Sequence, residues 1–274
     1  MDQPILELER IGKRYGAVEA LADVAFSVPR GQTLAICGDN GAGKSTLIRI
    51  ISGAQPPSEG TIRLKGRPAT FASPADALAK GVATIYQDLA LAPRLAIYQN
   101  VFLGSELRKR TWLPGLKVLD KKAMRVQARR HLERLRISIP DMDRPVQALS
   151  GGQRQAVAIA RALRWDAEIV IMDEPTAALG VKETRQVLDL VHEIKDQRIT
   201  VLLISHNMHD VVEVADRAVI LKAGRVANDV MLAGWTADQL SHEIMNREAS
   251  PSGTRKALSE DDGKCGQFAG AGRS

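Results

Sequence analysis

The chain has 274 residues, 45% hydrophobic and 26% charged, which is ordinary for a folded protein with one good core or a core and a smaller lobe. Aromatic residues make up only 4%, which argues against a nucleic-acid surface built on base stacking, and a net charge of +6 suits anionic partners without choosing among nucleotide, nucleic acid and membrane. The two cysteines, Cys37 and Cys265, exclude a disulfide framework and a four-cysteine zinc site.

The N-terminal sequence MDQPILELER is acidic and has no basic segment followed by an apolar stretch, so we expect no secretory signal. No apolar run approaches the length that crosses a bilayer. We therefore expect the protein in the cytosol.

Two short stretches near the N-terminus alternate between apolar and polar residues. Val24, Phe26 and Val28 alternate before a proline, and Ile62 and Leu64 alternate between two glycines. Alternation with a period of two is typical of antiparallel strands with one buried face. The sequence predicts a small antiparallel β lobe here.

Between these stretches lies GDNGAGKST, which fits the phosphate-binding pattern G-x-x-x-x-G-K-[ST] and directly follows the apolar run QTLAIC. Its glycines allow a concave loop whose N–H groups point at phosphate oxygens. Lys44 adds a cation for the β- and γ-phosphates, and the Ser45 hydroxyl can bind Mg²⁺. The following residues predict a helix whose N-terminus also favours phosphate. The predicted loop comprises Gly38, Asp39, Asn40, Gly41, Ala42, Gly43, Lys44, Ser45 and Thr46.

Continuous apolar runs further along the chain predict strands that are buried on both faces, as in a parallel sheet. A helical pattern from Thr184 to Lys195 separates two of them. Alternating strands and helices indicate an α/β core built on a mostly parallel sheet. The predicted strands are QTLAIC (32–37), VATIY (82–86), EIVIM (168–172), TVLLIS (200–205) and AVIL (218–221).

The segment 106–136 is strongly basic, with eleven Lys and Arg against three Asp and Glu. Met124, Ala128, Leu132 and Leu135 recur in it at helical spacing. We interpret the region from about 88 to 165 as a helical lobe inserted in the α/β core. Its charge marks either a solvated helix face or an anionic partner's surface.

LSGGQRQAVAIARAL, residues 149–163, predicts a helix with Ser150 as its N-cap and bare backbone amides at Gly151 and Gly152. Such a helix start can bind an anion. One phosphate loop already serves one nucleotide, so this second element is explained if it serves the nucleotide of another subunit. A glycine-softened helix start without a ligand is the alternative.

The run EIVIMDE ends in two carboxylates, Asp173 and Glu174. Ligands of open α/β sheets bind at the carboxyl ends of strands, so this pair and the phosphate loop are expected at one site. Asp173 can hold Mg²⁺ through water, and Glu174 can orient an attacking water. His206 follows the strand TVLLIS at the same edge. The other four histidines lack such a placement, and residues 249–274 are predicted to be a disordered tail.

The order of the motifs GDNGAGKST, LSGGQ, IVIMDEP and ISHNM is the one found in the ATP-binding-cassette (ABC) ATPases, which the chain resembles from residue 5 to about 240. We expect the ABC ATPase domain at residues 5–245. The resemblance implies that Tyr15 stacks on adenine and that Gln87 reaches Mg²⁺ and senses a membrane partner. It also implies that Glu174 is the general base and that His206 contacts the γ-phosphate. The resemblance further implies which residues close over the γ-phosphate held by the opposite subunit: Ser150, Gly151, Gly152 and Gln153.

IYQDLALAPRLAIYQNVFLG and TAALGVKE are similar to bacterial importers of the ribose and fructose type. With one cassette and no internal repeat, the resemblance implies a homodimer with two shared sites that binds ATP and Mg²⁺. It implies separate membrane permease subunits, a periplasmic sugar-binding protein, and a peripheral position at the cytoplasmic face of the inner membrane.

The sequence also permits two other classes of protein: an exporter ATPase, and a soluble cassette protein that acts on nucleic acid. The chain lacks the long heptad segment and zinc-type cysteine pairs of the latter. Gly180 stands where most cassette proteins have an aspartate that helps to couple the two sites. The resemblance therefore implies that this contact is lost or made by backbone.

Overall fold

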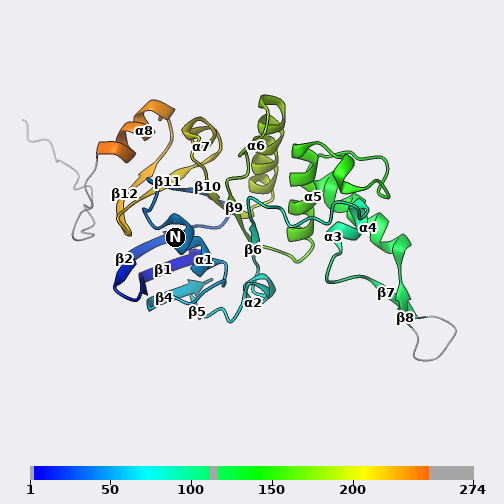
Figure 1. Cartoon of the computed structure of the whole chain (residues 1–274), viewed down its shortest axis with the longest axis horizontal. Coiled ribbons are helices and arrows are strands. Elements are labelled where there is room, and N and C mark those ends of the chain that lie inside the picture. Colours follow the sequence, from blue (N-terminus) through cyan, green and yellow to red (C-terminus); the bar gives the residue numbers. More distant parts are fainter. Residues whose placement is uncertain (1–2, 111–116, 247–274) are drawn as a thin grey trace, which may run out of the picture.

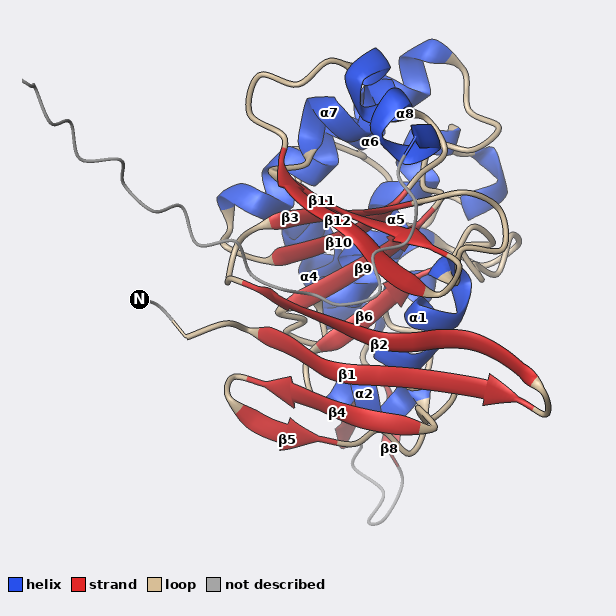
Figure 2. Cartoon of the chain, turned by 90° about the vertical axis from the view of Figure 1, so that its left-hand side faces the viewer, coloured by secondary structure: helices blue, strands red, loops and turns tan. Residues whose placement is uncertain are grey.

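The central feature of the computed structural model, which describes residues 3–110 and 117–246, is a six-stranded sheet of order β12-β11-β3-β10-β9-β6 (Figure 2). Its strands are parallel except β12, which runs antiparallel to β11. All five predicted strands are confirmed, because their continuous apolar side chains are buried. The strands are β3 (Thr33–Cys37), β6 (Val82–Ile85), β9 (Ile169–Asp173), β10 (Thr200–Ile204), β11 (Arg217–Lys222) and β12 (Arg225–Met231).

A second, antiparallel sheet has the order β2-β1-β4-β5, as the alternation near the N-terminus predicts. It consists of β1 (Leu6–Tyr15), β2 (Val18–Val28), β4 (Glu59–Leu64) and β5 (Arg67–Ala69). Val24, Val28 and Ile62 are buried against apolar side chains of α1 (Lys44–Ile51) and the central sheet. One core thus joins both sheets through the helix that follows the phosphate loop.

Four helices beside the sheets complete this part of the molecule: α2 (Pro74–Ala79), α6 (Val181–Asp196), α7 (Met208–Val214) and α8 (Ala237–Asn246). Helix α6 buries Val187, Leu188, Val191 and Ile194 on the predicted face. It begins three residues before the predicted Thr184. No helix in the described residues is long and apolar enough to cross a membrane.

The inserted lobe contains α3 (Ile97–Val101), α4 (Lys121–Arg134), the 3₁₀ turn η1 (Val146–Ala148) and α5 (Gly151–Leu163) (Figure 1). Met124, Ala128, Leu132 and Leu135 are buried, as their spacing predicts. A short hairpin, β7 (Arg108–Arg110) with β8 (Lys117–Leu119), was not predicted, because its first strand consists only of cations. Cys265 and the predicted tail lie outside the described residues.

Candidate functional site

The loop between β3 and α1 presents unused backbone donors. The N–H groups of Gly41, Gly43, Lys44, Ser45 and Thr46 make no hydrogen bond to another described residue. The first N–H groups of a helix lack intrahelical acceptors, and no side chain caps α1. This cluster of donors fits an anion with several oxygens, as a triphosphate is.

Lys44 is buried at the start of α1, and its ammonium donates to the carbonyl oxygens of Gly38 (2.6 Å) and Asp39 (2.9 Å). These contacts hold the cation against the loop that carries the free N–H groups. Gly43 is required here: its φ is +103°, and an added Cβ would lie 2.6 Å from Leu21 Cδ2. The loop is therefore packed tightly against β2.

Asp173 ends β9, and Glu174 follows it with φ +51°. The Glu174 N–H donates to the carbonyl of Ile204, the last residue of β10 (2.9 Å). Because β10 lies between β3 and β9, the phosphate loop and the acidic pair meet at one edge of the sheet.

Burial is the largest influence on the acidic pair and raises the pKa of both carboxyls above their ordinary values. For Glu174 the neighbouring Asp173 raises the pKa further, while His206 lowers it. His206 Nε2 lies 3.1 Å from Glu174 Oε1, and the Glu174 side chain is only 17% exposed. A carboxylate with a raised pKa beside an imidazole is suited to accept a proton.

This arrangement predicts a shift in the pH profile of hydrolysis. The ionised carboxylate is the active form, so activity is retained at high pH and lost as pH falls through a pKa raised above the usual Glu value of about 4.3. Replacing His206 with Gln removes a charge that lowers this pKa, so the acid limb of the kcat profile moves to higher pH. The ratio of variant to wild-type rates, measured from pH 5 to pH 9, cancels the titration of ATP itself. A ratio that does not vary with pH contradicts the pairing of His206 with Glu174.

The donors around this edge suit a small divalent cation. The Ser45 hydroxyl is exposed beside the loop donors, Asp173 supplies a half-buried carboxylate, and Gln87 lies exposed just beyond β6. Hydroxyl, carboxylate and amide oxygens are the hard ligands that Mg²⁺ takes together with phosphate oxygens. Among the described residues there is no cluster of three or more His, Cys, Asp or Glu that would form a separate metal centre.

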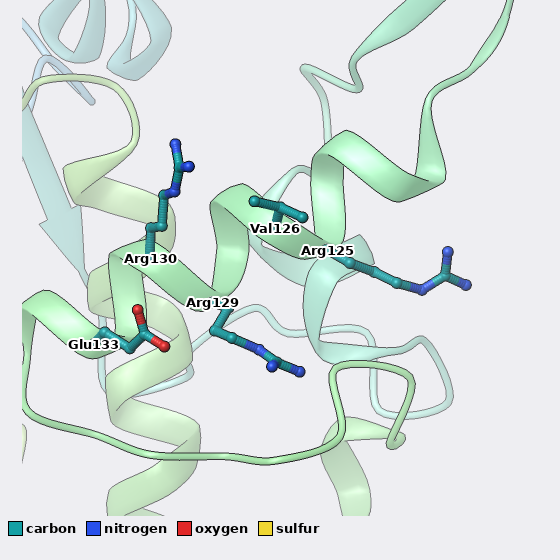
Figure 3. Close-up of a pocket in the computed structure, with 5 residues that line it drawn as sticks. All are labelled: Arg125, Val126, Arg129, Arg130 and Glu133. Atoms are coloured by element: carbon teal, nitrogen blue, oxygen red, sulfur yellow. The ribbon is translucent and has the colours of Figure 1, made fainter.

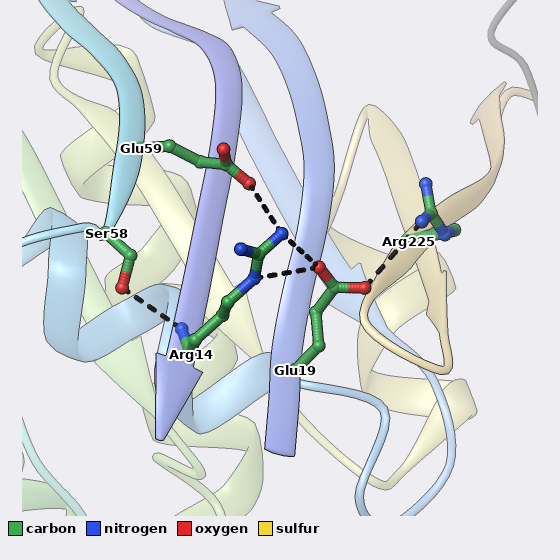
Figure 4. A network of polar contacts seen from close by, with 5 residues as sticks. All are labelled: Arg14, Glu19, Ser58, Glu59 and Arg225. Carbon is green, nitrogen blue, oxygen red and sulfur yellow. Dashed lines mark hydrogen bonds and ion pairs between the residues drawn. The ribbon is translucent and has the colours of Figure 1, made fainter. Parts of the chain in front are cut away.

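Tyr15 lies at the end of β1, 44% exposed, and its hydroxyl donates to Gln55 Oε1 (2.8 Å). A polar network anchors the neighbouring residue (Figure 4). The Arg14 N–H donates to Ser58 Oγ (3.1 Å), and its guanidinium contacts Glu19 and Glu59. The network extends to Arg225 in β12. It holds the strand end that presents the Tyr15 ring.

The second predicted anion element is at the N-terminus of α5. The Ser150 hydroxyl accepts from the Gln153 N–H (3.2 Å), and Gln153 Oε1 accepts from the Ser150 N–H (3.1 Å), which makes a capping box. The N–H groups of Gly151 and Gly152 have no partner among the described residues. Helix α5 lies in the lobe, apart from α1 and its phosphate loop (Figure 1). The predicted residues thus form two clusters: one at the phosphate loop with the acidic pair, and one at the N-terminus of α5.

Gly180 is the N-cap residue of α6 and has an extended backbone, with φ −73° and ψ 166°. A Cβ at this position would lie 2.8 Å from Glu183 Oε2. The Glu183 carboxylate therefore occupies the space beside the glycine. A carboxylate is present at this turn although residue 180 supplies none.

A hollow of about 340 Å³ lies on the outer face of α4, lined by Arg125, Val126, Arg129, Arg130 and Glu133 (Figure 3). Arg125 pairs with Asp143 through two hydrogen bonds, and Arg129 donates to the Pro140 carbonyl. These two cations hold the loop after α4. The hollow shares no residue with either cluster.

Sequence reasoning missed the side chains that fix the loop after Glu174. The Gln155 amide donates to the Pro175 carbonyl (2.8 Å), and the Thr176 hydroxyl donates to Asp210 Oδ2 (2.7 Å). Gln155 and Asp210 are both buried. A glutamine among the apolar positions of α5 was the available signal, because a buried polar side chain needs a partner.

The chain is similar to known proteins over most of its length. The profile of the family described as ABC transporter matches residues 21–177. The chain is 50% identical over 229 residues to the fructose import ATP-binding protein FrcA of Rhizobium meliloti, with 81% of this chain and 86% of that protein covered. It is 46% identical over 222 residues to the xylose/arabinose import ATP-binding protein XylG of Sulfolobus acidocaldarius, with the same coverage.

Among solved structures, it is similar to a dimeric ATP-binding cassette in a post-hydrolysis state bound to ADP and Pi. The TM-score is 0.66 at 26% identity, and the match covers 84% of this chain and all of that one.

Proposed function

The chain belongs to the ABC transporter family, and from that premise we propose that it is the ATP-hydrolysing subunit of a monosaccharide importer. The observation that carries the hydrolytic part is the set of free phosphate-loop donors beside Asp173 and Glu174. The sugar-import part is supported by high identity to fructose and xylose/arabinose import proteins over most of their length. We assign the cassette to residues 5–245, with the inserted lobe at about 88–165.

In the proposed reaction, ATP and water give ADP and phosphate. The loop N–H groups and Lys44 bind the β- and γ-phosphates, and Tyr15 stacks on the base. Glu174 accepts a proton from the attacking water, and His206 contacts the γ-phosphate and holds the Glu174 carboxylate. Ser45, Asp173 and Gln87 are the residues that would hold Mg²⁺, which neutralises charge on the phosphates.

We propose that two copies assemble as a homodimer, because the α5 cluster lies apart from the phosphate loop of its own chain. Ser150, Gly151, Gly152 and Gln153 of one subunit close over the nucleotide of the other. A two-fold dimer of this kind has two identical shared sites. The similarity to a dimeric cassette supports this assembly.

ATP favours the closed dimer through the contacts that it makes to both subunits, and hydrolysis removes them. The proposed partners are separate permease subunits in the membrane and, through them, a periplasmic sugar-binding protein. The chain then works as a peripheral subunit at the cytoplasmic face of the inner membrane.

The test is to co-purify the permease with this chain and to measure ATP hydrolysis with binding proteins loaded with fructose, ribose, xylose or arabinose. We expect one sugar-loaded protein to stimulate hydrolysis and the unloaded proteins to do so much less. Stimulation by DNA or RNA and by none of the sugar-loaded proteins would overturn the importer assignment.

A further inference from the structure

Helix α5 makes a buried polar contact with the chain directly after the proposed catalytic base. Gln155 is 6% exposed, and its Nε2 donates to the carbonyl oxygen of Pro175 at 2.8 Å. Pro175 follows Glu174 immediately and is itself buried. The helix whose N-terminus carries Ser150 is thereby joined to the catalytic loop of its own subunit.

Several hydrogen bonds join this loop to other parts of the chain, and they differ in origin. The Glu174 N–H is bound to Ile204, and the Thr176 hydroxyl is bound to Asp210; both partners belong to the α/β core. Among the hydrogen bonds that the described residues make to this loop, only the one to Pro175 comes from α5, in the inserted lobe. A displacement of α5 therefore acts on the loop at Pro175, while the other hydrogen bonds of the loop keep it attached to the core.

The same helix holds the segment after Gln87. The Arg161 guanidinium donates to the carbonyl oxygens of Leu89 (2.8 Å) and Ala90 (2.9 Å). Ala90 has φ +46°, a left-handed conformation that a non-glycine residue rarely adopts and that must be stabilised by its surroundings. Two carbonyls fixed by one planar guanidinium provide such a constraint.

We propose that Gln155 and Arg161 are positioning residues through which α5 sets the positions of Glu174 and Gln87 in its own subunit. The N-terminus of α5 faces the partner's nucleotide in the proposed dimer, so each subunit's catalytic groups respond to the nucleotide bound by the other. This inference rests on the proposed roles of Glu174 and Gln87. It assigns the route of communication between the two sites to side chains of α5.

The experiment compares Gln155→Met, which keeps the length of the side chain without its donor, and Arg161→Met with Arg161→Lys, which keeps a cation. Arg164→Lys is the matched control. Arg164 is also a half-buried arginine near the C-terminal end of α5, but it stacks on Phe102 and Trp165 and bonds to Ser105, away from both loops. The measurements are kcat, KM for ATP, thermal melting, and ATP-dependent dimerisation in a Glu174→Gln background.

We expect kcat to fall about tenfold in Gln155→Met and Arg161→Met, because a small misplacement of a catalytic group is costly. KM and ATP-dependent dimerisation stay close to wild type, Arg161→Lys recovers part of the rate, and Arg164→Lys changes only the melting temperature. A merely structural role would lower stability and leave kcat of the folded protein unchanged.

A folded Gln155→Met protein with kcat within about twofold of wild type overturns the inference for Gln155. If that variant does not fold, the Arg161 pair decides, and equal rates in Arg161→Met and wild type overturn it. The proposed function fails separately, if Glu174→Gln itself hydrolyses ATP at the wild-type rate.

Discussion

Glu174→Gln abolishes steady-state ATP hydrolysis, leaves ATP binding intact and accumulates an ATP-bound dimer; this is the largest effect that we expect. The amide has the size of the carboxylate but cannot accept a proton, and general-base catalysis contributes about 10²–10⁴-fold to a rate. The phosphate-loop donors and Lys44 are unchanged, so nucleotide affinity is retained. The measurements are kcat, equilibrium binding of ATP, and size-exclusion chromatography with ATP.

Glu168→Gln is the matched control. Glu168 immediately precedes the same strand, at its opposite end, where it pairs with Arg30 and Lys65. This substitution removes a carboxylate from the strand without touching the nucleotide site, so kcat stays near wild type. Rapid turnover in Glu174→Gln, or the absence of an ATP-dependent dimer, removes Glu174 from the role of base.

Ser150→Arg blocks hydrolysis without weakening the binding of ATP to the monomer. Ser150 is exposed at the start of α5, and a long cation there fills the space in which the partner's nucleotide must close. The substitution also removes a helix cap, which costs about 1 kcal/mol of stability. The measurements are kcat, ATP affinity of the monomer, and thermal melting.

Ser73→Arg is the control variant for the loss of a helix cap. The Ser73 hydroxyl caps α2 by accepting from the Asp76 N–H at 3.2 Å, and α2 contributes no residue to either cluster. We expect Ser73→Arg to lose stability and to keep its hydrolytic rate. Normal turnover in Ser150→Arg would contradict the shared-site arrangement.

Much of the fold follows from the sequence because its signals are local. Continuous burial made the five central strands recognisable, and helical spacing identified α4 and α6. The hairpin of β7 and β8 escaped prediction because Arg108, Lys109 and Arg110 carry no alternation. Its strands are defined by backbone pairing alone, which leaves no signature in side-chain polarity.

The candidate site likewise has parts that the sequence predicts and parts that it does not. The phosphate loop, the acidic pair and His206 were predictable, since each follows a buried strand and parallel strands end at one edge. The contacts of Gln155 and Arg161 could not be predicted. The Gln155 contact joins residues 20 positions apart, and the Arg161 contacts join residues about 70 positions apart. The carboxylate of Glu183 beside Gly180 likewise depends on the first turn of α6, which the predicted helix did not include.

The central claim, that each site is shared between two subunits, is tested most directly by mixing two inactive variants. Dimers are co-expressed from Glu174→Gln and Ser150→Arg chains with different affinity tags, and the mixed dimer is isolated through both tags. One of its sites carries both defects, while the other combines an intact Glu174 with the partner's intact Ser150. We predict that ATP hydrolysis rises well above that of both parents, to at most about half the wild-type rate, because one of two equivalent sites is complete while the α5 of its subunit carries Ser150→Arg. A mixed dimer as inactive as both parents would contradict the shared site.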